Sequence, residues 1–228
     1  LPAVPEEVLS LPGVHYGIFT NGAVVRDFGK NTWVSESCLS WEETIRVIEV
    51  LRRHPVIYDM YVSEDGVSET RLLAQLEEYG IPERECAYIR ATRRAVTDMV
   101  EYLREKKCPV QKMNLNFKDR ESKQAVRAKL EAMPEVLVTS SLPWNLELNA
   151  AGITKGSGLR NLCQYLGIEA EETMAFGDGE NDWPMLEAAG IGVAMENGAP
   201  FLKERADRIA ASNREEGVAE AIRQWVLI

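Results

Sequence analysis

The sequence has few of the residues on which several common kinds of site depend. Its 228 residues include only two histidines, His15 and His54, and four isolated cysteines that form no CxxC pair. We therefore expect neither a zinc site built on histidines nor a Ser-His triad. Four scattered cysteines in a chain of this length favour a reduced, cytoplasmic protein over a disulfide scaffold.

Long apolar runs and an excess of positive charge are also missing. No run approaches the ~20 apolar residues of a membrane span, and the start of the chain lacks the basic and apolar regions of a secretory signal. The 36 acidic and 26 basic side chains give a formal net charge of −10. Because that charge repels phosphate backbones, we expect no nucleic-acid partner and no binding to anionic membranes.

The chain is long enough for one large domain or two modest ones, and its middle differs from its two ends. Residues 40–140 mix helical and strand patterns, which predicts a compact α+β unit. Ser40, followed three residues later by Glu43, predicts a capping box at the start of the first helix of this unit. Residues 69–79 predict a second helix, which Gly80 would end.

The two ends of the chain predict an α/β fold. Residues 16–20 predict a strand that ends at the turn signal Asn21-Gly22, and a hairpin follows. Beyond the α+β unit, short apolar strands alternate with helices, which is typical of βαβ units and a parallel sheet. The predicted helices cover residues 155–166, 182–189, 200–206 and 217–226, and the predicted strands cover residues 173–176, 191–195 and 208–211.

The densest candidate site is the run Phe176-Gly-Asp-Gly-Glu-Asn-Asp182. Asp178 follows a predicted buried strand, where open α/β sheets bind their ligands, and Asp182 begins the next helix. Two carboxylates on one glycine-flanked loop favour a Mg²⁺ site. Helix N-capping is the alternative, but it accounts for only one of the two aspartates. An EF-hand is excluded because Trp183 occupies the position that needs glycine, and the sequence contains no GxxxxGK[ST] P-loop.

Lys155 is the second candidate, at the predicted N-terminus of the helix over residues 155–166. The helix dipole disfavours a cation at that end. A bound phosphate or a neighbouring carboxylate would compensate for this, and the alternative is a solvated surface lysine.

Together these segments resemble the haloacid dehalogenase-like hydrolases, most closely the Cof-type phosphatases with a large α+β cap. The resemblance lies in motifs spread over nearly the whole chain: Thr20-Asn21-Gly22-Ala23, Leu146-Glu-Leu148, Thr154-Lys155-Gly156, Gly177-Asp-Gly-Glu-Asn-Asp182 and Val193-Ala-Met-Glu-Asn197. It implies a Rossmann-like parallel-sheet core formed by residues 1–36 and 147–228, and an α+β cap inserted over residues 37–146. It also implies a Mg²⁺-dependent phosphatase that acts on small phosphorylated metabolites such as sugar phosphates.

The resemblance assigns roles to individual residues. Lys155 would hold the nucleophile and the phosphate. Asp178 would ligate Mg²⁺ directly, and Asp182 would complete the acidic site as a ligand or a supporting residue. Asn181 would contact the phosphate or the rest of the substrate, and Asn21 would line the pocket.

The implied cap would close over the substrate and select it. Met113, Asn114, Asn116 and Trp144 are candidates to face the pocket. We expect Met113 and Trp144 to be hydrophobic core residues instead.

The sequence departs from the family in two motifs that concern the chemistry. Members attack phosphorus with an aspartate of a DxD motif, and no DxD occurs in these 228 residues. The Ser/Thr of the family's second motif is missing as well. We expect both upstream of Leu1, so that the reaction passes through an aspartyl-phosphate. The alternatives are a non-catalytic module that binds a phosphorylated ligand, and a phosphomutase that uses the same site.

Overall fold

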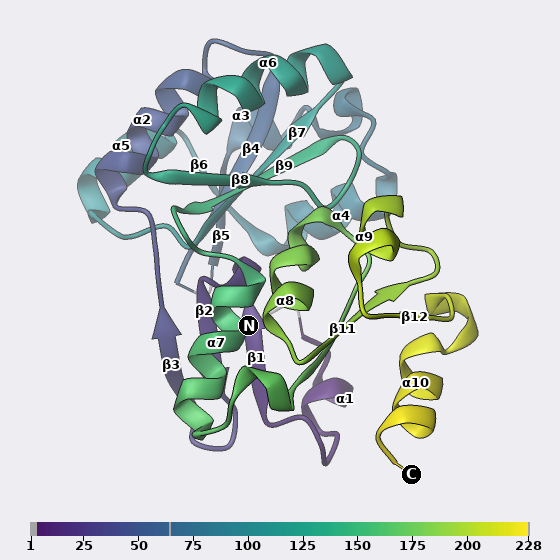
Figure 1. The fold of residues 1–228 in the computed structure, drawn as a ribbon. Coiled ribbons are helices and arrows are strands. Elements are labelled where there is room, and N and C mark those ends of the chain that lie inside the picture. The colour runs from purple at the N-terminus through teal and green to yellow at the C-terminus, as the bar shows by residue number, and fades with distance from the viewer. Residues whose placement is uncertain (1–3, 64, 228) are drawn as a thin grey trace.

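The protein is described by a computed structural model over residues 4–63 and 65–227, and its ribbon has an upper and a lower lobe (Figure 1). The upper lobe contains one six-stranded sheet, and the lower lobe contains two three-stranded sheets. The upper strands are β4 (Val56–Val62), β5 (Asp65–Glu69), β6 (Arg93–Val96), β7 (Lys112–Phe117), β8 (Val136–Thr139) and β9 (Asn145–Ala150). The lower strands are β1 (Tyr16–Phe19), β2 (Val24–Asp27), β3 (Thr32–Glu36), β10 (Met174–Gly177), β11 (Ile191–Met195) and β12 (Arg208–Ala210).

The upper sheet has the order β6-β5-β4-β7-β9-β8 and is antiparallel except between β5 and β6. Three helices cover one of its faces (Figure 1): α2 (Trp41–Leu51), α5 (Met99–Lys106) and α6 (Arg120–Glu131). The helices α3 (Thr70–Leu73) and α4 (Glu83–Thr92) lie beside β5 and β6. Because side chains alternate along β7, Met113 and Leu115 are fully buried in the core, whereas Lys112 and Asn114 point to the opposite face.

Several local predictions for this lobe are confirmed and others are wrong. The capping box of α2 is present: Ser40 Oγ accepts from the Glu43 N–H, and the Glu43 carboxylate accepts from the Ser40 N–H. Met113 is a core residue as expected, but Trp144 is 39% exposed, because it lies in the turn between β8 and β9.

The helix predicted over residues 69–79 is also wrong. The strand β5 runs to Glu69, and only the short helix α3 and a 3₁₀ turn, Leu76–Tyr79, follow it. The buried carboxylate of Glu69 accepts hydrogen bonds from Arg52 and from the Met99 N–H and forms an ion pair with Arg71. These tertiary contacts hold Glu69 in the sheet and override its helical propensity.

The lower lobe has the predicted α/β organisation. The strands β10, β11 and β12 form a parallel sheet, and β1, β2 and β3 form an antiparallel one. Its helices are α1 (Glu6–Leu9), α7 (Lys155–Leu166), α8 (Trp183–Ala188), α9 (Pro200–Arg205) and α10 (Gly217–Trp225). The bounds of α7 are those predicted, and its capping box joins Thr154 and Ser157.

Two glycines allow the segments of this lobe to approach one another closely. A Cβ atom on Gly156 of α7 would lie 2.0 Å from the Pro184 carbonyl oxygen of α8. A Cβ atom on Gly22 would lie 2.0 Å from the Thr154 carbonyl oxygen, and the φ of Gly22, +93°, already disfavours other residues. The N-terminus of α7 is therefore in direct backbone contact with both α8 and the turn Thr20–Gly22.

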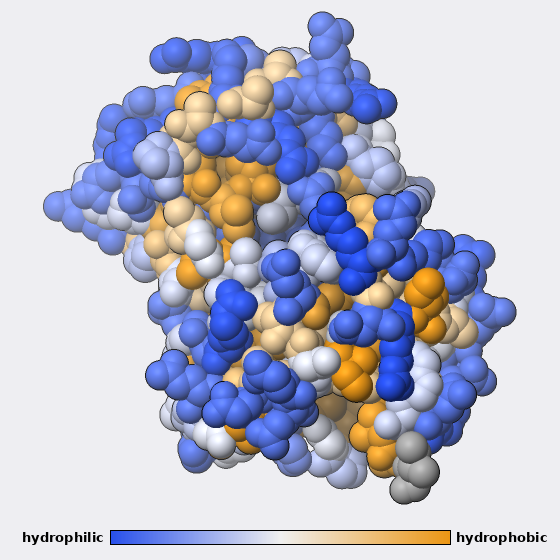
Figure 2. Space-filling view, in the orientation of Figure 1, coloured by the Kyte–Doolittle hydropathy of each residue, from blue (hydrophilic) through white to orange (hydrophobic). Residues whose placement is uncertain are grey.

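Hydrophilic residues cover most of the face of the molecule seen in Figure 2, and apolar residues reach the surface near the C-terminus. Those in and just after α10 include Val218, Ile222 and Val226, each at least 36% exposed. Over the described ranges, none of the helices has both the length and the apolar character that crossing a membrane requires.

Candidate active site

Asp178 and Asp182 lie on the loop that joins β10 to α8. The carboxylate of Asp182 turns back into the loop, where one oxygen, Oδ2, accepts from the N–H groups of Asp178 and Gly179, both at 2.9 Å. It makes no capping hydrogen bond to α8. Gly177 leaves room for this arrangement, since a Cβ atom there would lie 2.4 Å from the Cβ of Asp182. Asp182 therefore shapes the loop and does not cap the helix.

Lys155 at the start of α7 meets the same carboxylate. Its Nζ donates to Oδ1 of Asp182. The side chain of Asp182 is only 9% exposed, whereas that of Lys155 is 29% exposed. The compensation expected for a cation at a helix N-terminus is thus supplied in this structure by a carboxylate. An ammonium has three N–H donors, so two remain for a ligand.

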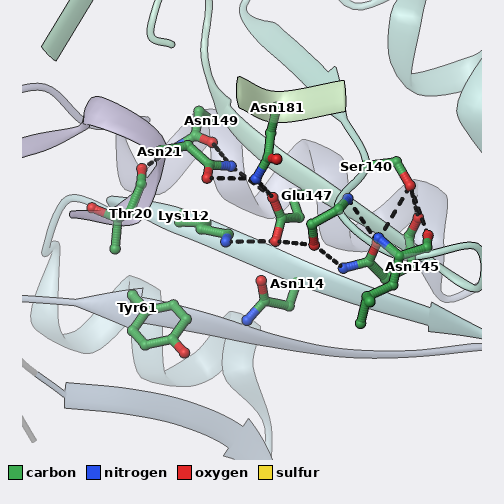
Figure 3. A network of polar contacts seen from close by, with 12 residues as sticks. Thr20, Asn21, Tyr61, Lys112, Asn114, Ser140, Asn145, Glu147, Asn149 and Asn181 are labelled. Atoms are coloured by element: carbon green, nitrogen blue, oxygen red, sulfur yellow. Dashed lines mark hydrogen bonds and ion pairs between the residues drawn. The ribbon is translucent and has the colours of Figure 1, made fainter. Parts of the chain in front are cut away.

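Asn21 and Asn181 form a second group, centred on a residue without an expected role, Glu147 of β9 (Figure 3). The Nδ2 of Asn21 donates to Oε2 of Glu147 at 2.8 Å, and the Nδ2 of Asn181 donates to the same oxygen at 3.1 Å. The Nδ2 of Asn181 also lies 3.3 Å from Oδ1 of Asn21. The turn Thr20–Gly22 and the loop that bears Asp178 are therefore joined through one buried carboxylate.

The other oxygen of Glu147 faces the upper sheet. It accepts from Lys112 Nζ at 2.8 Å and from Ser141 Oγ at 3.0 Å. Burial raises the pKa of Glu147, but the charge and hydrogen bond of Lys112, together with the hydrogen bonds of Asn21 and Ser141, outweigh burial and leave this pKa below its ordinary value. Glu147 is therefore ionised at neutral pH.

The predicted site residues thus fall into two adjacent groups. Lys155, Asp182 and the backbone of Asp178 form one, and Asn21 and Asn181 form the other around Glu147. The 3₁₀ turn Glu180–Asp182 belongs to both groups because it carries Asn181 and Asp182. Its first residue, Glu180, pairs at 2.8 Å with Arg127 of α6, which links the loop to a helix of the upper lobe.

The fit to a divalent cation differs between the two aspartates. Both oxygens of Asp182 are engaged by Lys155 and by backbone N–H groups. Asp178 is exposed, and Asn197 donates to one of its oxygens at 3.2 Å. Within residues 4–63 and 65–227, no three His, Cys, Asp or Glu side chains gather into a metal-ligating group. Asp178 therefore fits Mg²⁺ as a single carboxylate ligand, a mode this ion accepts when water and substrate phosphate complete its shell.

Glu147 and Lys112 are the residues that sequence reasoning missed. Their spacing contained a signal, because Leu146-Glu147-Leu148 alternates as a strand with one polar face, as does the segment that begins at Lys112. The register pairs Asn114 with Glu147 and Met113 with Leu148, so Lys112 and Glu147 are diagonal neighbours on one face. The spacing of polar residues within each strand does not predict that the two strands pair with each other.

The chain is similar to a known protein family and to several curated proteins. The model of the haloacid dehalogenase-like hydrolases matches residues 5–222. The 5-amino-6-(5-phospho-D-ribitylamino)uracil phosphatase YcsE of Bacillus subtilis is 42% identical over 116 residues, which are 51% of this chain and 47% of that protein. The phosphoglycolate phosphatase of Methanosarcina acetivorans is 40% identical over 96 residues, 42% of this chain and 42% of that protein. The chain thus spans less than half the length of either curated relative in these matches.

A solved haloacid dehalogenase-like hydrolase from B. subtilis has the same fold. It superposes with a TM-score of 0.82 at 24% sequence identity, and the superposition covers 94% of this chain and 81% of that one. At 24% identity this similarity shows the fold alone, and it includes both lobes of the chain.

Proposed function

This chain belongs to the haloacid dehalogenase-like hydrolases, and we therefore propose that it is part of a Mg²⁺-dependent phosphatase. The enzyme would hydrolyse small phosphorylated metabolites such as sugar phosphates. Two relatives that are at least 40% identical over part of their length are named phosphatases of small phosphorylated molecules. The reaction would pass through an aspartyl-phosphate, and the nucleophilic aspartate would come from a DxD segment upstream of residue 1.

The observation that carries this proposal is the contact between Lys155 and Asp182 beside Asp178. Asp182, anchored by two backbone N–H groups, fixes the direction of the Lys155 ammonium. An ammonium held in place can stabilise the charge on a transferring phosphoryl group without first reorganising. Lys155 would thus bind the phosphate and, with Asp182 as its anchor, act in catalysis.

Asp178 would ligate Mg²⁺, with Asp182 as a supporting residue behind it. When bound, the ion supplies positive charge next to the phosphate oxygens. Asn21 and Asn181 would line the substrate pocket, because both lie at the junction of the loop, the turn and the upper sheet.

The upper lobe would be the cap, proposed over residues 37–146. Because β9 pairs with β7 and β8, the C-terminal boundary of the cap would lie a few residues further along the chain, at the end of β9. The contacts Arg127–Glu180, Asn21–Glu147 and Asn181–Glu147 support this role, because each connects the upper lobe to the loop or the turn at the site. A small phosphate ester is the partner that we propose, and the four free thiols support a reducing compartment such as the cytoplasm.

The test begins with the intact mass of the natural protein, since a mass above the 25.6 kDa of these residues is expected if it contains an upstream DxD segment. That protein should release inorganic phosphate from simple phosphate esters only with Mg²⁺. Asp178→Ala should abolish the release, whereas Asp65→Ala, which removes an exposed partner of Arg94, should not change it. Turnover by the Asp178 variant would refute the metal assignment.

The second candidate is a module that binds phosphorylated ligands without turnover, through Lys155, Asn181 and the backbone of the loop that bears Asp178. A natural protein of 25.6 kDa that binds inorganic phosphate and hydrolyses no ester would favour it. Transfer of the phosphoryl group to a second sugar hydroxyl, detected by product analysis, would favour a phosphomutase instead.

A further inference from the structure

Glu147 is a carboxylate whose burial needs an explanation. It is 5% exposed in β9, between Leu146 and Leu148, both of which are fully buried. Burying a charge is unfavourable unless it is fully compensated, and an apolar residue in a strand of this kind would avoid the penalty. Here four side-chain donors compensate the charge, two for each oxygen. All four are contacts between side chains and lie outside the backbone ladder that pairs β9 with β7 and β8.

The four donors come from separate parts of the molecule. Lys112 belongs to β7 of the upper sheet, and Ser141 to the turn after β8. Asn21 comes from the turn after β1, and Asn181 from the loop after β10. Figure 3 shows Asn21, Asn181 and Lys112 converging on Glu147.

The carboxylate also constrains how the two asparagine side chains are turned, and for Asn21 it does so together with Asn149, whose Oδ1 accepts from the same Nδ2 at 3.2 Å. A carboxylate accepts hydrogen bonds and donates none, so each amide must face it with its NH₂ group. The carbonyl oxygens then point away from Glu147. Asn21 Oδ1 lies 3.3 Å from the Nδ2 of Asn181, and Asn181 Oδ1 lies on the side of Gly179. A neutral amide at position 147 would not impose one orientation.

We propose that Glu147 is a positioning residue that fixes the orientation of Asn181 and, together with Asn149, that of Asn21, and that it couples both to Lys112 of the upper sheet. It acts through these side chains and does not itself touch the phosphate. The consequence for ligand binding rests on the function proposed above, but the positioning itself does not.

The first test reads the side-chain amides directly. In the natural protein, the NH₂ resonances of Asn21 and Asn181 should be dispersed and slow to exchange with solvent. In Glu147→Gln both should move toward the values of free asparagine. The matched control is Glu135→Gln, which breaks an ion pair with Arg46 away from this network and should leave both amides unchanged. Unchanged amides in Glu147→Gln would overturn the proposal.

The second test is a double-mutant cycle on the binding of inorganic phosphate. Glu147→Gln and Asn181→Ala should each weaken the affinity about tenfold, the effect of losing one hydrogen bond to a charged group. If Glu147 acts through Asn181, the double variant should bind no more weakly than the worse single variant. Additive losses would overturn the proposal.

Two outcomes separate this inference from the proposed function. A wild-type natural protein that binds no phosphate, but whose amides respond to Glu147→Gln, would contradict the function and support the positioning role. If the Gln variant does not fold, Glu147→Asp keeps the charge but shortens the side chain by one methylene. It should lose the same amide signals, and their retention would overturn the proposal.

Discussion

The two lobes are stabilised in different ways. One continuous core of aliphatic and aromatic side chains lies between the upper sheet and its helices. The parallel sheet of the lower lobe is flanked by two separate clusters with four buried hydrophobic residues each. There the predicted site residues meet through backbone contacts at glycines and through charged hydrogen bonds. Substitutions in the apolar core of the upper lobe should therefore affect mainly stability, and substitutions of the charged site residues of the lower lobe should affect mainly ligand binding.

The largest expected effect is that of Leu115→Ala in the middle of the upper sheet. Leu115 is fully buried, and truncating such a side chain leaves a cavity that lowers the free energy of unfolding by about 2–5 kcal/mol. Denaturant unfolding would measure the loss, and phosphate affinity at low denaturant should be unchanged. A loss below about 1 kcal/mol would show that the surrounding side chains move in to fill the cavity. The upper lobe would then not depend on its continuous core in the way proposed.

Gly156→Ala adds a single methyl group in the lower lobe, where the added Cβ would lie 2.0 Å from the Pro184 carbonyl oxygen. Because α7 must move away from α8, we expect a loss of about 1–3 kcal/mol, as for other overpacked sites. Phosphate affinity should fall too, since Lys155 moves with the helix. The control is Gly13→Ala, where no atom lies within 4 Å of the added Cβ. Equal effects of the two variants would contradict the close contact.

Lys155→Met should separate binding from stability. Loss of the ammonium should weaken the binding of inorganic phosphate about tenfold or more, while the unfolding free energy changes less than in Leu115→Ala. Lys203→Met is a matched control, because its side chain is also 29% exposed and also pairs with a carboxylate, that of Glu196. Titration calorimetry would compare the variants, and equal phosphate affinities of both would refute the assignment of Lys155.

The smallest expected effect is a dependence of stability on pH that comes from Glu147. Its pKa in the folded protein is lowered from the ordinary 4.5, so the native state favours the ionised form. The resulting stabilisation is present above the pKa of the unfolded chain and is lost as pH falls from about 4.5 through the folded value. Denaturant unfolding of the wild type and Glu147→Gln should therefore differ most at neutral pH and converge in acid. A difference in unfolding free energy that grows in acid would contradict the lowered pKa of Glu147.

Much of the lower lobe could be predicted because its signals are local. The helix over residues 155–166 is predicted from that segment alone, and Asp178 and Asp182 are close in sequence on their glycine-flanked loop. The parallel sheet follows from the alternation of short apolar strands and helices. Such features depend on residues within a few positions of one another.

The parts that sequence reasoning missed depend on partners far away in the chain. Glu147 is separated by more than 30 residues from Lys112 and Asn181, and by far more from Asn21. The strand β5 has the sequence DGVSE, which has no strong strand pattern, and long-range contacts hold its last residue, Glu69. No local pattern contains these pairings, so propensity and periodicity could not supply them.

The contact between Gly156 and Pro184 has a consequence for genetic variation. Every amino acid other than glycine has a Cβ atom, so each missense change in the Gly156 codon places an atom 2.0 Å from the same carbonyl oxygen. The position has no conservative replacement, in contrast to core sites such as Leu115, where methionine or isoleucine can be accommodated. Natural variants should therefore be more frequent at the large apolar residues of the upper lobe and rare at Gly156.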